Sequence, residues 1–139
     1  MRTLIHAAVA IVIAVGLASC GITSPSDLKT EAPFTGTIHP GDTIGSGNGL
    51  PTLPFTTSKT GEFIVKITAM APDTGATIGV LYGAPSAGLC GEENANSAAQ
   101  LGHTVFDQTL PQGSYCLQVF DSGGGLTRPE TFTISVQHS

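Results

Sequence analysis

Residues 62–70 read EFIVKITAM, and apolar and other side chains alternate along them with a period of two. One side of such a segment carries Phe63, Val65, Ile67 and Ala69. In an extended chain successive side chains point to opposite faces, so this period predicts a β-strand with one buried face. Residues 130–137, ETFTISVQ, show the same pattern with Phe132, Ile134 and Val136 on the inner side. Two segments almost 70 positions apart therefore predict strands of the same kind.

Further strands are predicted wherever a short apolar or β-branched run lies between turn residues. They cover about residues 34–39, 55–58, 76–83, 103–110 and 114–121. Thr60-Gly61 and the LPQG segment 110–113 each predict a tight hairpin between the strands that flank them. In the PDTG turn, residues 72–75, Asp73 is expected to form an Asx bond and Gly75 to supply a positive φ. The longest loop expected is 84–102, with at most one helical turn near 95–101.

Seven to eight short strands with frequent turns predict an all-β fold, an antiparallel β-sandwich, over residues 34–139. The composition agrees, since charged residues make up 11% of the chain, Gly occurs 18 times and Trp is absent. The formal net charge is −5, and lysines and arginines are never clustered. A nucleic-acid partner is therefore not expected, because phosphate binding needs a positive surface.

The N-terminus reads as an export signal. One arginine precedes the apolar run LIHAAVAIVIAVGL, residues 4–17, whose length suits a signal peptide and is short for a membrane span. The ending LASC, residues 17–20, resembles the bacterial lipobox. That resemblance implies removal of residues 1–19 and acylation of Cys20. Residues 21–33 contain Ser, Thr, Pro and charges without periodicity, so residues 20–33 are expected to form the lipidated cysteine and a flexible tether. A simple secretory signal and an uncleaved anchor helix are the alternatives.

Lipid on Cys20 implies a protein held on a bacterial membrane, outside the cytoplasm in the cell envelope. The next residue is Gly21 and not Asp. By resemblance to lipoprotein sorting, this favours the outer membrane in a host with two membranes.

Cys90 and Cys116 form an even pair once Cys20 is set aside. In an oxidising compartment such a pair predicts a disulfide. A metal pair or a redox site is less expected, because the chain has no C-x-x-C spacing and no histidine close in sequence to either cysteine.

The segment HTVFDQTLPQGSYCLQVFDSGG, followed by ETFTISV, resembles the end of bacterial pre-peptidase C-terminal (PPC-like) domains. The matching hairpin positions are Leu110, Pro111, Gly113 and Tyr115. Upstream, FTTSKTGEFIVKITAMAP is similar to the strand–Gly–strand pair that opens the core of that family. The resemblance implies a jelly-roll-like sandwich, usually a non-catalytic accessory to secreted enzymes.

Candidate chemistry is sparse. The sequence has no G-x-S-x-G and no H-E-x-x-H; His39, His103 and His138 are dispersed, and Ser114 is interpreted as a turn residue. Glu92 and Glu93, together with Asn94 and Asn96, and separately Asp121, offer oxygen atoms to Ca²⁺, although their spacing is not that of a dedicated calcium loop.

Only Tyr82 and Tyr115 could stack on a sugar ring, and both alternate with expected core residues. The sequence thus favours a non-catalytic, lipid-anchored envelope module that binds a protein or glycan partner. The alternatives are a calcium-dependent carbohydrate-binding accessory module and, less favoured, a small hydrolase.

Overall fold

The computed structural model describes residues 27–46, 49–87 and 89–139. The expected signal peptide, the lipid site Cys20 and residues 21–26 of the expected tether lie outside the described residues. The described residues contain no α-helix, and none of their helical segments is long and apolar enough to cross a membrane.

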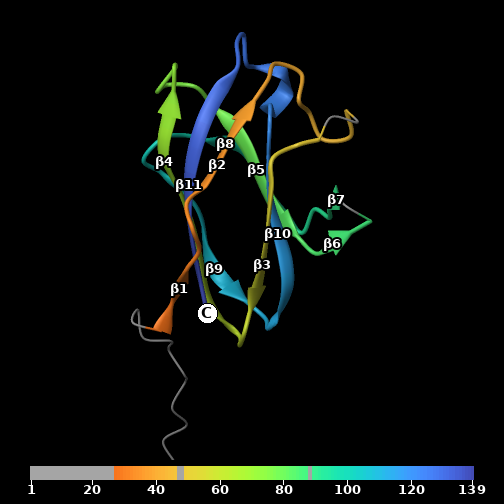
Figure 1. Cartoon of the computed structure of the whole chain (residues 1–139), viewed down its shortest axis with the longest axis vertical. Coiled ribbons are helices and arrows are strands. Elements are labelled where there is room, and N and C mark those ends of the chain that lie inside the picture. The colour runs from red at the N-terminus through yellow and green to blue at the C-terminus, as the bar shows by residue number, and fades with distance from the viewer. Residues whose placement is uncertain (1–26, 47–48, 88) are drawn as a thin grey trace, which may run out of the picture.

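Two antiparallel sheets form the body of the domain (Figure 1). The first sheet consists of β2 (Phe34–Ile38), β11 (Glu130–His138), β4 (Gly61–Ala71) and β9 (Thr104–Leu110), with β1 (Lys29–Thr30) also paired to β11. The second sheet has the order β3 (Thr52–Thr57), β10 (Gly113–Phe120), β5 (Ile78–Gly83) and β8 (Asn94–Ala99). A two-stranded hairpin, β6 (Pro85–Ser86) with β7 (Leu89–Cys90), lies outside both sheets. The predicted all-β antiparallel sandwich is confirmed.

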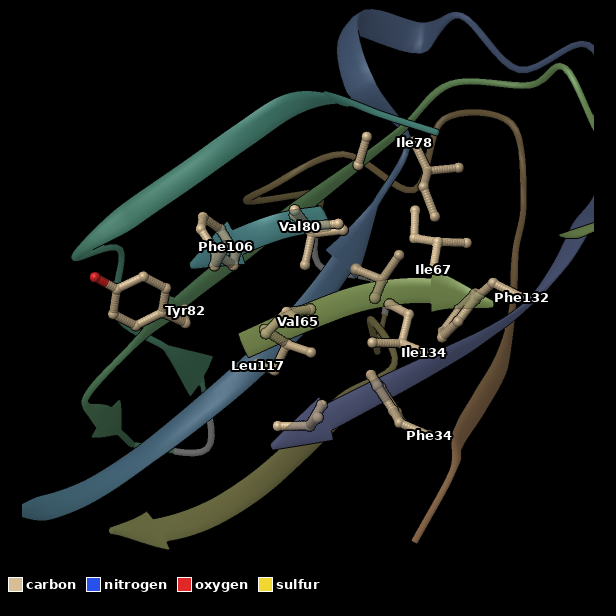
Figure 2. Close-up of a cluster of buried hydrophobic side chains, with 14 of the residues drawn as sticks. Phe34, Val65, Ile67, Ile78, Val80, Tyr82, Phe106, Leu117, Phe132 and Ile134 are labelled. Atoms are coloured by element: carbon tan, nitrogen blue, oxygen red, sulfur yellow. The ribbon is translucent and has the colours of Figure 1, made fainter. Parts of the chain in front are cut away.

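The main core lies between the two sheets and is built from alternate residues of their strands (Figure 2). Val65 and Ile67 of the first sheet and Val80 and Leu117 of the second are fully buried. The inner positions of 130–137 are buried as predicted. Burial of apolar surface on this scale is the main stabilising term for a domain of this size.

A second, smaller apolar cluster covers the outer face of the second sheet. It contains Leu81, Cys90, Cys116 and Phe120. Because β5 and β10 have one face in each cluster, all six residues of β5 are buried, as the apolar run 76–83 predicted. Gly79 lies beneath the Phe120 ring, where a Cβ atom would come within 2.2 Å of it.

The alternation predicted for 62–70 holds as far as Ile67 and then shifts by one residue. Ile134 of β11 pairs with Ile67 while Thr133 pairs with Ala69, so Thr68 is the extra residue of a β-bulge. Ala69 is therefore exposed, which corrects the prediction, and Met70 takes the core position. The Thr68 hydroxyl donates to the Thr133 carbonyl at 3.2 Å, next to the bulge.

The two predicted hairpins are wrong. β3 and β4 belong to different sheets, and so do β9 and β10, so both short turns cross the sandwich. The rings of Phe55 and Phe63 stack 5.2 Å apart across the core instead of lying side by side. Thr57 joins the two turns, because its hydroxyl donates to the Pro111 carbonyl at 2.8 Å and accepts from the Gly113 amide at 2.9 Å.

Three other expectations need correction. The expected loop 84–102 contains β6, β7 and the edge strand β8, and β8 replaces the helical turn near 95–101. Sheet pairing begins at Lys29 and not at residue 34, because β1 lies within the expected tether. In the PDTG turn the Gly75 amide donates to Asp73 Oδ1 at 2.9 Å as predicted, but Gly75 has no positive φ.

Candidate functional site

The cysteine pair joins the β6–β7 hairpin to the middle strand β10. Cys90 and Cys116 are bonded, with an S–S distance of 2.09 Å and a Cα–Cα distance of 5.6 Å, which confirms the predicted disulfide. Both residues are buried in the outer apolar cluster. The bond is therefore a structural staple, and it fixes the start of the segment that leads into β8.

Asp121, the first candidate calcium ligand, is completely buried. Its Oδ2 accepts from the Gly41 amide at 2.9 Å and its Oδ1 from the Leu126 amide at 3.1 Å. Both carboxylate oxygens thus hold backbone amides of the β2–β3 and β10–β11 loops. This arrangement fits a loop anchor.

Glu92 and Glu93, the other two candidate ligands, are exposed in the short segment before β8. Asn94 and Asn96, which were grouped with them, begin β8. Among the described residues, no three His, Cys, Asp or Glu side chains gather closely enough to hold a metal ion.

The two tyrosines belong to the core, as their alternation suggested. Tyr82 and Tyr115 are 4% and 8% exposed, so neither ring offers a face for stacking on a sugar. The Tyr115 hydroxyl donates to the Pro111 carbonyl at 3.1 Å, and burial, reinforced by the charge of Glu93, raises the Tyr115 pKa. The hydroxyl of Tyr82, in contrast, points away from the core cluster (Figure 2).

Ser114 and the three histidines named from the sequence lie on separate parts of the fold. Ser114 is exposed on β10, and His103 is exposed in the β8–β9 turn. His39 is an exposed residue after β2, with Nδ1 3.3 Å from Asp42 Oδ2. Only His138, in β11, is buried. The structure therefore brings none of them together with Ser114.

His138 belongs to a polar clasp that fastens β1 to β11. Its Nε2 lies 2.8 Å from Glu31 Oε1, and Lys29 Nζ lies 2.6 Å from the same oxygen. The hydrogen bond from Lys29, followed by that from His138, lowers the pKa of Glu31 below its ordinary value of 4.5. The clasp holds the point where the chain enters the sheet.

This clasp predicts an acid-sensitive attachment of β1. A carboxyl with a lowered pKa adds stability that is fully present above its ordinary pKa and is lost as the pH falls through the folded value. The stability difference between the wild type and Glu31→Gln should therefore be constant from pH 7 to about pH 5 and shrink below about pH 4.5, the ordinary glutamate range. Urea denaturation followed by circular dichroism measures it. Glu92→Gln, in an exposed segment, is the control, and a Glu31→Gln difference that stays constant down to pH 3 would contradict the clasp.

The surface of the described residues includes two shallow hollows that are candidates for binding. One, of about 370 Å³, lies over β2, β11 and β4 and is lined mainly by threonine and alanine. The other, of about 460 Å³, is the β8–β9 cleft, lined by residues 94–98 and 105–108. Strands β8 and β9 are edge strands of opposite sheets, so this cleft is the open side of the sandwich.

Asn96 holds the two sides of the β8–β9 cleft together. Its Oδ1 accepts from the Ala98 amide at 2.9 Å, and its Nδ2 lies 3.4 Å from the Val105 carbonyl. Ala98 and Val105 both lie in β-bulges, where the ladder to the next strand is interrupted. The Asn96 side chain thus forms hydrogen bonds with a backbone amide and a backbone carbonyl that lie where strand pairing is interrupted.

A row of polar side chains forms the far end of the cleft. Gln108 Nε2 donates to the Tyr82 hydroxyl, and Asn94 Nδ2 lies 3.4 Å from Gln108 Oε1. Asp107 is exposed on the other face of β9, because it pairs with Ile64 whereas Gln108 pairs with the core residue Phe63. Asn94, Asn96 and Tyr82 were named from the sequence, but Gln108 was not. Its signal was a polar residue at an inward position of the strand, between Phe106 and Leu110.

No protein-family model, curated protein or solved structure matches this chain. The resemblance to PPC-like domains therefore stays a prediction.

Proposed function

We propose that this protein is a lipid-anchored, non-catalytic binding module of the bacterial cell envelope. The observation that carries the proposal is the LASC ending of the apolar run, which presents Cys20 for acylation. Diacyl or triacyl modification gives stable membrane attachment, whereas one short chain gives only marginal binding. An outer-membrane location in a host with two membranes follows from Gly21.

The shape of the domain suits attachment at one end. β1 and the C-terminus lie at the same end of the sandwich as the β3–β4 and β9–β10 turns, while the β10–β11 connection lies at the other (Figure 1). The segment from residue 21 to residue 28 can reach at most about 29 Å when fully extended. A membrane at this end leaves the β8–β9 cleft, on the side of the sandwich, accessible to a partner.

The polar side chains of the fold support a binding role over a catalytic one. Asp121 holds two loops, Thr57 joins two turns and His138 fastens β1. Each of the three therefore has a structural task. A catalytic site would instead need a nucleophile, a base and an orienting group within hydrogen-bond reach of one another.

The anchor is tested by replacing its sulfur. Cys20→Ala should abolish incorporation of radiolabelled palmitate and leave an unprocessed precursor on a denaturing gel, because the thioether cannot form. The matched control is the double variant Cys90→Ala/Cys116→Ala, which should keep the label. Continued labelling of Cys20→Ala would contradict the anchor.

A further inference from the structure

Strand β8 is attached to the second sheet by little apolar surface. Its sequence is NANSAA, so alanine is its largest apolar side chain and it has no β-branched residue. β3, the opposite edge strand of the same sheet, has the same length of six residues but buries the ring of Phe55. A phenylalanine removes far more apolar surface from water than an alanine does. The two edges of one sheet are therefore held with unequal strength.

The side-chain hydrogen bonds of the two edge strands show the same contrast. Within the part of the chain that the structure describes, three side-chain contacts link residues 94–100 to other segments, and each of them is 3.4 Å long: Asn94 to Gln108, Asn96 to the Val105 carbonyl, and Gln100 to Thr77. The usual range for an N–H···O bond is about 2.7–3.2 Å. Thr57 of β3, in contrast, makes its two bonds across the turns at 2.8 and 2.9 Å.

Both ends of β8 are firmly held. The Glu93 amide, just before the strand, donates to the Tyr82 carbonyl at 2.9 Å and directly follows the disulfide-bonded hairpin. At the other end Ala99 is buried in the main core, and the Gly102 amide donates to the Ile67 carbonyl at 2.9 Å. Weak attachment is thus confined to residues 94–98, between two fixed points.

A bulge separates these residues from the buried end of the strand. Between the pairs Val80–Asn96 and Ile78–Ala99, β8 has two residues where β5 has one. The ladder is interrupted there, and the Ala98 amide donates to the Asn96 side chain at 2.9 Å. Opening that begins in the first half of β8 can therefore stop at the bulge without disturbing Ala99.

We propose that residues 94–98 of β8 are a gate that detaches from β5 as a unit while both sheets stay folded. Each opening uncovers one edge of β5 and widens the β8–β9 cleft beside Tyr82 and Phe106, whose rings lie 5.0 Å apart (Figure 2). Segments that open to admit ligands are drawn from the least stable parts of a fold. This inference goes beyond the proposed binding function and does not depend on the lipid anchor.

Native-state hydrogen exchange tests the gate. The full-length lipidated protein, isotopically labelled in detergent micelles, is followed by NMR at several urea concentrations below the unfolding transition. After correction for intrinsic rates, the hydrogen-bonded amides of residues 94–98 should exchange at least about a hundredfold faster than those of β3 that pair with β10. Their rates should change little with urea, because local opening exposes little surface. The amides of Glu93 and Gly102 should stay as protected as those of β3.

Asn96→Ala removes the contact with the Val105 carbonyl and should raise exchange in residues 94–98 about fivefold further, the value of one ordinary hydrogen bond. The exchange of β3 should not change. Thr37→Ala is the matched control, because Thr37 is exposed on the first sheet, and it should alter neither strand.

Three results would overturn the gate. The first is exchange of residues 94–98 at the rate and with the urea dependence of β10, because the strand would then open only with the whole domain. The second is a joint loss of protection at Glu93 and Gly102, which would mean that the ends are not fixed. The third is an Asn96→Ala protein whose β8 amides exchange at the wild-type rate, because Asn96 would then not hold the gate closed.

Discussion

Replacing Gly83 with alanine is expected to destabilise the domain by about 3 kcal/mol, the upper end of what overpacking usually costs. Gly83 ends β5 at the point where the chain turns out into the β6–β7 hairpin and returns. A Cβ atom there would lie 1.8 Å from the Gly91 carbonyl oxygen and 2.9 Å from the Glu93 amide nitrogen. Both are backbone atoms, so relief requires the whole returning segment to move.

Urea denaturation of Gly83→Ala, followed by far-ultraviolet circular dichroism, measures this loss. Gly49→Ala is the matched control, because nothing lies within 4 Å of its added Cβ and its φ is not positive. The control should differ from the wild type by less than about 0.5 kcal/mol. If Gly83→Ala were as stable as this control, the segment that follows the β6–β7 hairpin would not be closely packed against Gly83.

The disulfide is the second place where a large effect is expected. The double variant Cys90→Ala/Cys116→Ala should lose about 3.5 kcal/mol, because the bond closes a loop of about 27 residues in the unfolded chain. The sequence separation of the two cysteines is 26. Alanine is chosen over serine because the two sites are only 8% and 2% exposed. A serine hydroxyl buried there without a hydrogen-bond partner would destabilise the fold further.

Chemical reduction of the wild type is the control for this variant, since it opens the same loop without removing a side-chain atom. Both should shift the urea midpoint in the same direction. Hydrogen exchange at the Gly91 amide, which donates to the Ala84 carbonyl at 2.9 Å, should also become faster. A loss smaller than about 1 kcal/mol would mean that the loop is already restricted in the unfolded state.

Strand positions were predictable wherever one face of a strand is regularly buried. The inner positions of 130–137 and the run 76–83 were placed correctly, because burial leaves a period of two or a continuous apolar stretch. The alternation at 62–70 failed only after Ile67. A bulge adds one residue without any signal in the composition. As a result Met70, and not Ala69 as predicted, occupies the buried position.

The pairing of the strands was less predictable than their positions. Turn residues such as Thr60-Gly61 and Pro111 show that the chain reverses, but not whether it stays in one sheet or crosses to the other. That choice depends on which face each strand must bury, as the stacking of Phe55 on Phe63 shows. β8, with the sequence NANSAA, was missed because it has no β-branched residue and depends on its pairing with β5.

In the candidate site, too, features that depend on local sequence were predictable and features that depend on distant contacts were not. The disulfide could be predicted from the count of cysteines once Cys20 was set aside, because that argument needs no geometry. Asp121 was named only as a weak candidate calcium ligand, and its task of holding two loops could not be predicted because it depends on Gly41, 80 positions away. The β8–β9 cleft could not be predicted, since it exists only where two edges from different sheets meet.

The topology also determines how late the domain can finish folding. β11, the last of the described strands in chain order, pairs with β1, β2 and β4, so no arrangement of the first sheet is complete before it is present. Among the described strands, only the short β6 and β7 pair with their immediate neighbour in sequence. Loop closure must precede nearly every contact, which is the regime of slow folding, on a scale of milliseconds to seconds. In a chain built this way most strands wait for a partner that is far away in sequence, so much of its length stays unfolded until its final described strand is present.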